Sequence, residues 1–440
     1  MTATTSESLP WVETTTLSRH IGARVRMRGW LHAVRDLGTI SFLVLRDGRG
    51  TAQLIASREV CAQLGTAGPE SVLEVTGIIR AAPKAPGGVE LDAQTLRVVT
   101  AVTETLPVTL GKKTLAASLP VLLDHAPLTL RHPERRAVFR LSALAMQGFR
   151  ATLTDLGFVE IQTPKLVESA TEGGANVFEV EYFGRKAYLA QSPQFYKQIM
   201  VGVFERVFEV GPVFRAEPHA TSRHVNEYVS LDVELGFIQS HEDVMRVLRE
   251  VLAGMFATLR QHGASELALL EAQVPDVPAI IPAVTFEEAQ GIAARALGTP
   301  PSLEPDLSPA EERAVGEWAW EAHGSAFVFV TGYPLAKRPF YTHPNPERPL
   351  ASNSFDLLFR GTELVTGGQR LHRHSDYVAA IAARGLPIAP FESYLQAFQY
   401  GMPPHGGFAI GLERFLMQLL GAENLREVTL FPRDMHRITP

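Results

Sequence analysis

Charged side chains interrupt strand-like hydrophobic runs at four places in the chain, which is unusual for the strands of a core. The first such segment, residues 213–234, contains Arg215 and Glu217 and, in a polar loop, Arg223 and His224. We expect Arg215 and Glu217 to share one face of a strand, because side chains alternate along it. Arginine binds phosphate through paired hydrogen bonds and stabilises charge that develops in an in-line displacement. The segment predicts a site for a nucleoside triphosphate; without a Gly-x-x-x-x-Gly-Lys-Ser/Thr loop, the chain is not a P-loop enzyme.

The second segment is glycine-rich, residues 406–414, and the third begins at Glu363. Glycine permits close approach of a backbone, and the run leads into an expected helix, residues 412–420, with Arg414 in its first turns. The helix dipole favours cations at the opposite end, so a ligand role for this arginine is more attractive. Glu363 and Thr366 offer the hard oxygen ligands that Mg²⁺ takes together with phosphate and water.

The fourth segment is residues 191–197, Gln-Ser-Pro-Gln-Phe-Tyr-Lys, preceded by Thr-Glu-Gly-Gly at residues 171–174. Each of the four segments taken alone is explained by an ordinary surface salt bridge or turn. Their occurrence together and in this order is far more specific.

Length and composition limit the class of protein. The chain has 440 residues, more than one hydrophobic core usually spans, so two domains are expected. Its 45% hydrophobic and 20% charged residues are typical of a globular protein, and no apolar run is long enough for a transmembrane helix. We expect no secretory signal, since the N-terminus lacks a basic start and an apolar core. The single cysteine, Cys61, excludes an internal disulfide and a thiolate zinc cluster, and a reducing, cytoplasmic setting is expected.

The charge is unevenly distributed. The net charge of −6 argues weakly against a nucleic-acid partner, but residues 16–60 hold eight arginines against three acidic residues. Alternation from Arg24 to His32 places Val25 and its i+2 neighbours on one face, and the arginines with His32 on the other. This basic face suits a nucleic acid, although a solvated strand face would explain it equally well.

Five short strands are expected within residues 17–105, which suits the small barrel called the OB-fold. Such barrels often bind single-stranded nucleic acid, and Phe42 could serve either as a stacking platform or as ordinary core. We expect residues 1–16 to be a mobile tail and residues 106–132 to be a connector. Residues 133–440 begin with a helix to about residue 156 and continue as an α+β domain, with a mostly antiparallel sheet flanked by helices.

At this point the chain resembles the class II aminoacyl-tRNA synthetases of subclass b, in particular aspartyl enzymes of the archaeal and eukaryotic type. The likeness covers residues 17–440. Residues 157–164, Gly-Phe-Val-Glu-Ile-Gln-Thr-Pro, resemble motif 1, which builds the dimer interface of the family. Residues 213–234 and 406–414 resemble motifs 2 and 3, and these two motifs together are highly specific.

The resemblance implies an ATP site, with Arg215, Glu363 and Arg414 as catalytic residues. That ATP site would comprise Arg215, Glu217, Arg223, His224, Val225, Tyr228, Glu363, Gly411, Leu412, Glu413 and Arg414. Arg223 and His224 would contact the outer phosphates, and Glu363 and Thr366 would ligate Mg²⁺. ATP and Mg²⁺ are the implied co-substrate and cofactor.

The resemblance also implies an aspartate site. That site would comprise Glu172, Gln194, Lys197, Arg215, Asp232, Thr366 and Arg370. Glu172 and Gln194 would contact the amino group, while Lys197, held by Asp232, and Arg370 would contact the side chain. Two cations in a buried pocket favour a carboxylate over an amide, and asparaginyl relatives lack the lysine.

In the barrel, the resemblance places Arg35, Phe42 and Gln53 where the family reads the middle anticodon base. His32 and Pro86 stand where relaxed enzymes, which charge both tRNA(Asp) and tRNA(Asn), carry His and Pro. A relaxed enzyme is therefore expected, together with a tRNA-dependent amidotransferase that converts the mischarged product. A homodimer is the expected assembly.

Two alternatives remain open. One is an asparaginyl-tRNA synthetase, which Lys197 argues against. The other is a synthetase-like paralogue that makes a free amino-acid amide or only binds RNA. The anticodon-type barrel argues against an amide synthetase, and the presence of Arg215, Glu363 and Arg414 together argues against an inactive binder.

Overall fold

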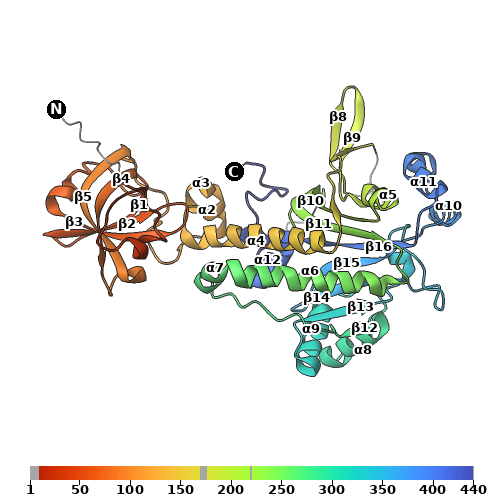
Figure 1. Ribbon diagram of the computed structural model, residues 1–440. Coiled ribbons are helices and arrows are strands. Elements are labelled where there is room, and N and C mark those ends of the chain that lie inside the picture. The colour runs from red at the N-terminus through yellow and green to blue at the C-terminus, as the bar shows by residue number, and fades with distance from the viewer. Residues whose placement is uncertain (1–8, 169–175, 219–220, 440) are drawn as a thin grey trace. The chain divides into compact units, whose positions relative to one another are not determined.

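The computed structural model describes residues 9–168, 176–218 and 221–439 and divides into two compact units, one ending at Arg136 and the other beginning at Ala137 (Figure 1). None of the helices in these ranges combines the length and apolar character needed to cross a membrane.

The first unit is built on a closed barrel with the strand order β1-β2-β3-β5-β4. Its strands are β1 (Arg24–Asp36), β2 (Ile40–Arg46), β3 (Thr51–Ser57), β4 (Val72–Ala81) and β5 (Val89–Thr100). Alternate side chains such as Leu43, Leu45 and Leu54 fill the interior, while Phe42 and Gln53 lie on the outer face. This barrel confirms the OB-fold expected from the sequence.

Short helices complete the first unit. They are η1 (Leu17–His20), α1 (Arg58–Ala62), η2 (Pro86–Gly88), α2 (Leu119–Asp124) and α3 (Ala126–Thr129). The side chain of Ser57 accepts a hydrogen bond from the backbone N–H of Val60 and so caps α1. The turn η2 joins β4 to β5, the loop in which Pro86 was expected.

Residues 9–16 are fastened to the barrel, unlike the mobile tail expected for residues 1–16. The backbone N–H of Thr14 donates to Asp47 Oδ2 at 2.8 Å and its hydroxyl to Oδ1 at 2.7 Å. Trp11 lies under the guanidinium groups of Arg26 and Arg28, at 4.4 and 5.2 Å from the ring centroid. Part of the basic face of β1 therefore binds the chain's own N-terminal segment.

The second unit contains a sheet with the order β12-β13-β14-β15-β16-β11-β10-β6. Its strands are β6 (Val159–Glu160), β10 (Arg206–Phe214), β11 (Glu227–Gly236), β12 (Ala283–Thr285), β13 (Phe327–Thr331), β14 (Ser354–Phe359), β15 (Thr362–Gln369) and β16 (His405–Gly411). The β6–β10 and β12–β13 pairs are parallel and the others antiparallel. A second, small sheet has the order β7-β9-β8, from β7 (Leu166–Val167), β8 (Glu179–Tyr182) and β9 (Arg185–Leu189).

Helices surround this sheet (Figure 1). They are α4 (Pro133–Asp155), α5 (Gln194–Phe204), α6 (His241–His262), α7 (Ala264–Leu269), α8 (Phe286–Leu297), α9 (Pro309–His323), α10 (His374–Ala383), α11 (Glu392–Gln399) and α12 (Leu412–Leu420), with single turns η3 (Leu335–Lys337), η4 (Ala389–Phe391) and η5 (Leu425–Glu427). Capping boxes at Ser240, Thr285 and Ser308 begin α6, α8 and α9. The antiparallel sheet and its helices confirm the α+β class.

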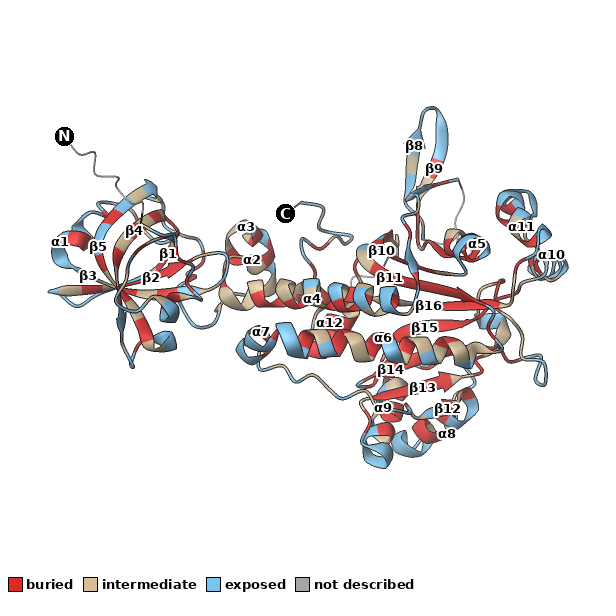
Figure 2. Ribbon diagram, in the orientation of Figure 1, coloured by how far each residue is buried: buried red, intermediate tan, exposed pale blue. Residues whose placement is uncertain are grey.

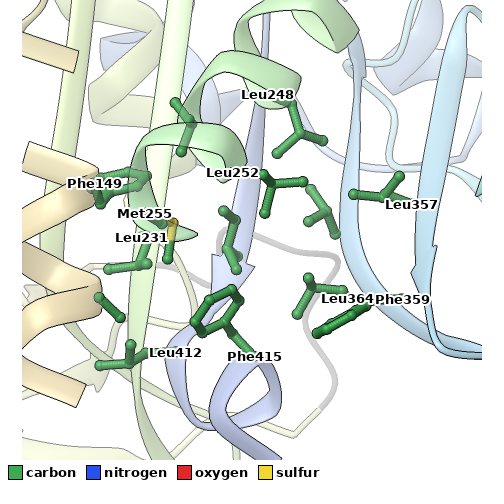
Figure 3. Close-up of a cluster of buried hydrophobic side chains, with 14 of the residues drawn as sticks. Phe149, Leu231, Leu248, Leu252, Met255, Leu357, Phe359, Leu364, Leu412 and Phe415 are labelled. Carbon is green, nitrogen blue, oxygen red and sulfur yellow. The ribbon is translucent and has the colours of Figure 1, made fainter. Parts of the chain in front are cut away.

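The main core lies between one face of the sheet and helices α4, α6 and α12 (Figure 3). Leu231 of β11 meets Phe149, Met255 and Phe415 in this cluster. The strands at the middle of the sheet are buried along most of their length (Figure 2). Because side chains alternate, the other face of β11 presents Ser230, Asp232 and Glu234. One strand thus separates an apolar core from a polar face, and the pocket opens on that polar face.

Candidate active site

A pocket of about 400 Å³ is lined by the polar face of β11 and by β15 and β16. It brings together fifteen of the residues singled out in the sequence: Gln194, Lys197, Arg215, Glu217, Arg223, His224, Val225, Tyr228, Asp232, Glu363, Thr366, Arg370, Gly411, Glu413 and Arg414. Glu172 lies outside the described residues. The four segments, far apart in the chain, therefore converge on one cavity.

Arg215 and Glu217 lie in the loop after β10, which ends at Phe214, so the expectation that they share a strand face is wrong. The loop keeps them together, with 3.8 Å between Arg215 Nη1 and Glu217 Oε1. His224 Nε2 lies 3.5 Å from Glu217 Oε2, and its Nδ1 bonds the hydroxyl of Thr221 at 2.6 Å. An arginine and a histidine therefore flank one carboxylate in the lining of the pocket.

A β-bulge brings Glu363 and Thr366 to the same face. In a regular strand, residues three apart point to opposite faces, but here Leu357 pairs with Val365 and Leu358 with Glu363. The extra residue, Leu364, joins the core together with Val365. The hydroxyl of Thr366 consequently donates to Glu363 Oε1 at 3.0 Å, and two oxygen ligands face the pocket side by side.

Two further carboxylates lie beside this pair and were missed in the sequence. Asp356 is opposite Thr366 in the β14–β15 ladder, and Glu312 Oε2 accepts the backbone N–H of Glu363 at 3.2 Å. Burial, and then the nearby Glu363 carboxylate, raise the pKa of Glu312 to about 7. Burial raises the pKa of Asp356 as well, with Arg338 opposing and Glu363 adding to the effect. Carboxylates that lie this close together form a site that suits a bound cation.

Arg338 supplies a cation that sequence reasoning also missed. Its Nη2 donates to Asp356 Oδ1 at 2.9 Å and its Nε to Ser354 Oγ at 3.0 Å, and its guanidinium lies 4.0 Å from the Tyr333 ring centroid. Arg338 lies more than a dozen residues before its partners Ser354 and Asp356, and it belongs to no recognisable motif. The sequence therefore contained no indication of its role.

At the back of the pocket, two ion pairs are buried. Lys197 Nζ donates to Asp232 Oδ1 at 2.9 Å, as expected. Arg370 Nε donates to Glu234 Oε1 at 3.0 Å, and Lys197 Nζ lies 3.5 Å from the other oxygen of Glu234. Glu234, which is 0% exposed, thus joins the two cations and was not predicted. The sequence did contain an indication of this role, because Ser230, Asp232 and Glu234 are every second residue of β11 and so share one face.

The charges in this cluster stabilise each other. Although burial alone raises it, the pKa of Glu234 is lowered because Arg370 and Lys197 favour its ionised form. Burial likewise lowers the pKa of Arg370, yet the net shift is upward because of the Glu234 carboxylate. A Cβ at Gly407 would stand 2.2 Å from Glu234 Oε2. It would also stand 2.1 Å from the backbone oxygen of Val233, so this glycine permits the close backbone approach expected from the sequence and leaves room for the Glu234 carboxylate.

The three motif 3 residues Leu412, Glu413 and Arg414 have different surroundings. Arg414 Nη1 donates to the backbone oxygen of Glu363 at 3.2 Å and lies 3.7 Å from its Oε1. The carboxylate of Glu413 accepts the backbone N–H of Val229 at 3.1 and 3.2 Å, and burial raises its pKa to about 7. Leu412 is buried in the core, so its expected contribution to the ATP pocket is wrong for its side chain. The periodicity of α12 turns the side chain of Leu412 toward the sheet and the main core.

In the barrel, three predicted residues share the outer face. Arg35 pairs with Phe42 across β1 and β2, and Phe42 pairs with Ile55 on β3, two residues from Gln53. Gln53 Nε2 donates to Glu90 Oε2 at 2.8 Å. An arginine, an aromatic ring and an amide on one open face are suited to stacking and to hydrogen bonding with an unpaired base.

His32 does not lie on that face, so its expected exposed position is wrong. The β1–β2 register shifts between Leu31 and Ala33, and this bulge turns His32 inward to 7% exposure. Its Nδ1 lies 3.7 Å from Glu70 Oε1, and Glu70 Oε2 accepts from Arg46 at 2.6 Å and from Arg131 at 3.2 Å. Pro86, in contrast, is exposed in the turn η2. The role of either residue in tRNA choice stays a prediction.

The family described as tRNA synthetases class II (D, K and N) matches residues 119–435, and the family described as OB-fold nucleic acid binding domain matches residues 25–99. The first match covers well over half of the sequence. This chain belongs to the class II tRNA synthetases of the D, K and N group.

Comparison with named relatives indicates which enzymes of this group the chain resembles. The chain is 48% identical over 431 residues to the Aspartate--tRNA(Asp/Asn) ligase of Deinococcus radiodurans, covering 96% of this chain and 97% of the relative. It is 47% identical over 424 residues to the enzyme of the same name from Thermus thermophilus, with 96% and 98% covered. The structure of asparaginyl-tRNA synthetase from Pyrococcus horikoshii with asparaginyl-adenylate matches with a TM-score of 0.89 at 30% identity, covering 96% of this chain and 97% of that one.

Proposed function

We propose that this chain is an ATP-dependent ligase that joins L-aspartate to tRNA(Asp) and tRNA(Asn) through an aspartyl-adenylate. The observation that carries the proposal is the buried Lys197–Asp232 and Arg370–Glu234 cluster at the back of the pocket that Arg215 lines. The relatives named Aspartate--tRNA(Asp/Asn) ligase support both the amino acid and the pair of tRNAs.

The amino acid is selected by the hydrogen-bond donors of Lys197 and Arg370. Lysine and arginine can only donate hydrogen bonds, so both side-chain oxygens of aspartate find donors, whereas the amide nitrogen of asparagine would face donors. Arg370 donates to protein atoms from Nε and Nη2, and within the described residues its Nη1 makes no hydrogen bond, which leaves Nη1 for the ligand. Asp232 and Glu234 keep the two cations in place and charged when no substrate is bound.

The first step needs no general base, because the α-carboxylate of aspartate is already a nucleophile. One of its oxygens forms a bond to the α-phosphorus of ATP, and the bond from that phosphorus to the bridging oxygen breaks, releasing pyrophosphate with the electron pair. Arg215 stabilises the α-phosphate, while Arg223 and His224 hold the outer phosphates. Glu217 and Tyr228 hold the adenine, and Arg414 packs on its other face.

In the second step, the terminal 3′-hydroxyl of the tRNA attacks the aspartyl carbonyl carbon. The bond to the phosphate oxygen breaks, AMP leaves, and the hydroxyl proton is transferred to the departing phosphate group or to water. An ester between aspartate and the tRNA remains.

Magnesium fits the donor set at Glu363 and Thr366, with Asp356 beside them. Within the described residues no three His, Cys, Asp or Glu side chains form a complete metal cage. That agrees with a Mg²⁺ ion held by one or two protein oxygens together with phosphate and water. When bound, the ion supplies positive charge next to the phosphates. The protein itself holds these oxygens together. The β-bulge places Glu363 and Thr366 on one face, and the contact with Glu312 fixes the backbone of Glu363.

ATP–pyrophosphate exchange tests the amino-acid assignment. Exchange is expected with L-aspartate, and asparagine should support it far less. Exchange driven by asparagine and not by aspartate would establish an asparaginyl enzyme instead.

tRNA choice is expected to depend on the surroundings of Pro86 and His32. The two anticodons differ at the third base, C against U, and one well-placed group is worth roughly tenfold to hundredfold. Pro86→Lys adds a cation on an exposed turn, and His32→Trp places an indole beside Glu70 and so displaces Arg46. We expect the double variant to lose roughly tenfold to hundredfold in charging of tRNA(Asn), with tRNA(Asp) little changed.

The matched control for this experiment is Pro83→Lys, which adds the same charge to the same loop. It should leave the ratio of the two charging efficiencies unchanged. A wild-type enzyme that already rejects tRNA(Asn) by a hundredfold would sink the relaxed assignment and leave only the aspartyl one. A relaxed enzyme requires an amidotransferase that converts aspartyl-tRNA(Asn) to asparaginyl-tRNA(Asn), and this is the functional partner we propose.

A homodimer is proposed, with residues 158–164 at its two-fold axis. The sheet ends at β6, whose Val159 is exposed, and an unpaired edge beside the groove that Glu160 and residues 143–155 of α4 line suits a self-complementary contact. Light scattering at micromolar concentration should give about twice the 48.2 kDa of one chain. Val159→Arg should lower this mass, and the control Ile280→Arg, at an exposed site elsewhere, should not. An active protein of single-chain mass contradicts the proposal.

A further inference from the structure

A buried hydrogen-bond network stands behind the pocket and takes no part in the chemistry proposed above. It joins Gln194 and Gln198 of α5 to Tyr377 of α10, Tyr394 of α11 and His405 of β16, all 3% exposed or less. Gln198 Nε2 lies 2.9 Å from both Tyr377 Oη and His405 Nε2. Gln198 Oε1 accepts from Gln194 Nε2 and from Tyr394 Oη, each at 2.9 Å. Of these residues, only Gln194 lines the pocket.

The directions of the bonds made by Gln198 and Gln194 are set at His405, while the one hydroxyl proton of Tyr394 is shared between Gln198 Oε1 and Tyr377 Oη, 3.1 Å away. Its Nδ1 lies 2.9 Å from the backbone oxygen of Pro403, which can only accept, so the proton is on Nδ1. Burial lowers the pKa of His405 to about 4, so the ring is neutral and Nε2 is an acceptor. Tyr377 donates to the backbone oxygen of Leu371 at 2.8 Å, and so its oxygen also accepts from Gln198.

The two acceptors fix the amide of Gln198. Its NH₂ group must face Tyr377 and His405, so its Oε1 must face Gln194. The NH₂ group of Gln194 then turns toward Gln198, away from the pocket. Within the described residues Gln194 Oε1 accepts no hydrogen bond, and it is the end of the amide that remains for a ligand. The orientation of one side chain in the pocket thus follows from the tautomer of a histidine two residues away in the network.

We propose that His405 and Gln198 are positioning residues that present the carbonyl oxygen of Gln194 to the α-ammonium group of the amino acid. This inference rests on the proposed function. An ammonium group only donates, so a reversed Gln194 amide would set donor against donor at a side chain that is only 3% exposed. The network therefore selects substrates that carry a free α-amino group, while Lys197 and Arg370 select the side chain.

The test compares L-aspartate with succinate, which has the same two carboxylates and no amino group. Both are measured as ligands in ATP–pyrophosphate exchange, aspartate as substrate and succinate as competitor. The wild-type preference for aspartate should fall about tenfold or more in Gln194→Met, and in the same direction in Gln198→Met and His405→Phe. The KM for ATP should not change. The control Gln396→Met makes the same substitution on the exposed side of α11 and should behave as wild type.

Non-additivity separates positioning from general structural damage. If Gln198 acts through Gln194, the double variant Gln194→Met with Gln198→Met loses no more preference than Gln194→Met alone. Should Gln198→Met fold poorly, Tyr394→Phe removes one donor to Gln198 Oε1 with little change in packing and should lower the preference in the same direction. Additive losses, or an unchanged preference in Gln198→Met and Tyr394→Phe, overturn the inference. A wild type that does not activate aspartate would instead overturn the proposed function.

Discussion

Arg370→Leu is expected to reduce aspartate activation severely, with a loss in kcat/KM of roughly thirtyfold to several thousandfold, equivalent to about 2–5 kcal/mol. The substitution removes a charged, buried donor that the side-chain carboxylate of aspartate needs. It also leaves Glu234 with Lys197 alone at a position that is 0% exposed. The free energy of unfolding should therefore fall too, by roughly 3–5 kcal/mol.

A second variant separates the two effects. Arg370→Leu combined with Glu234→Gln removes both charges of the pair, so thermal unfolding should move back toward the wild type while pyrophosphate exchange stays severely reduced. Arg373→Leu, at an exposed arginine three residues away, is the matched control and should exchange normally. Exchange near the wild-type rate in the double variant would show that Arg370 does not bind the side chain of aspartate.

Glu363→Gln is expected to reduce the rate of adenylate formation by about a hundredfold or more while ATP binding weakens little. The bulge in β15 places this carboxylate beside Thr366, and the charge it contributes matters most where charge develops during the displacement. The backbone oxygen that accepts from Arg414 is retained in the variant, so the local fold should survive. Single-turnover adenylate formation and ATP affinity, each measured across a range of magnesium concentrations, give the two quantities.

Glu317→Gln, on the exposed side of α9, makes the same substitution away from the pocket and should leave both quantities unchanged. The metal assignment would be wrong if Glu363→Gln kept its rate and its dependence on magnesium.

The barrel and the antiparallel sheet could be predicted from local periodicity in the sequence, whereas most of the pocket residues followed from the resemblance of the motifs to those of a known family. The helix expected at residues 412–420 has the bounds found in the structure. Fifteen predicted residues line one cavity. A strand or a helix is determined largely by a stretch of neighbouring residues, whereas the convergence of distant segments on one cavity is not.

What the sequence could not supply depends on bulges and long-range partners. His32 turns inward at a bulge that alternation does not anticipate, and the contact of Thr366 with Glu363 exists through another. Asp356, Glu312 and Arg338 belong to elements whose place beside Glu363 follows only from the folded sheet. The pairing of Lys197 and Arg370 with carboxylates changes the physical account of selectivity. Asp232 and Glu234 balance the charges of these two cations, so the geometry of their hydrogen-bond donors, and not excess positive charge at this point, selects aspartate.

Charging of purified tRNA(Asp) and tRNA(Asn) with L-aspartate, side by side and at the same ionic strength, tests the central claim most directly. The account predicts aspartyl-tRNA from both acceptors, with charging efficiencies within about tenfold of each other, and no product from either when L-asparagine replaces aspartate. Attachment of asparagine to tRNA(Asn), or failure of aspartate to charge tRNA(Asp), would contradict it.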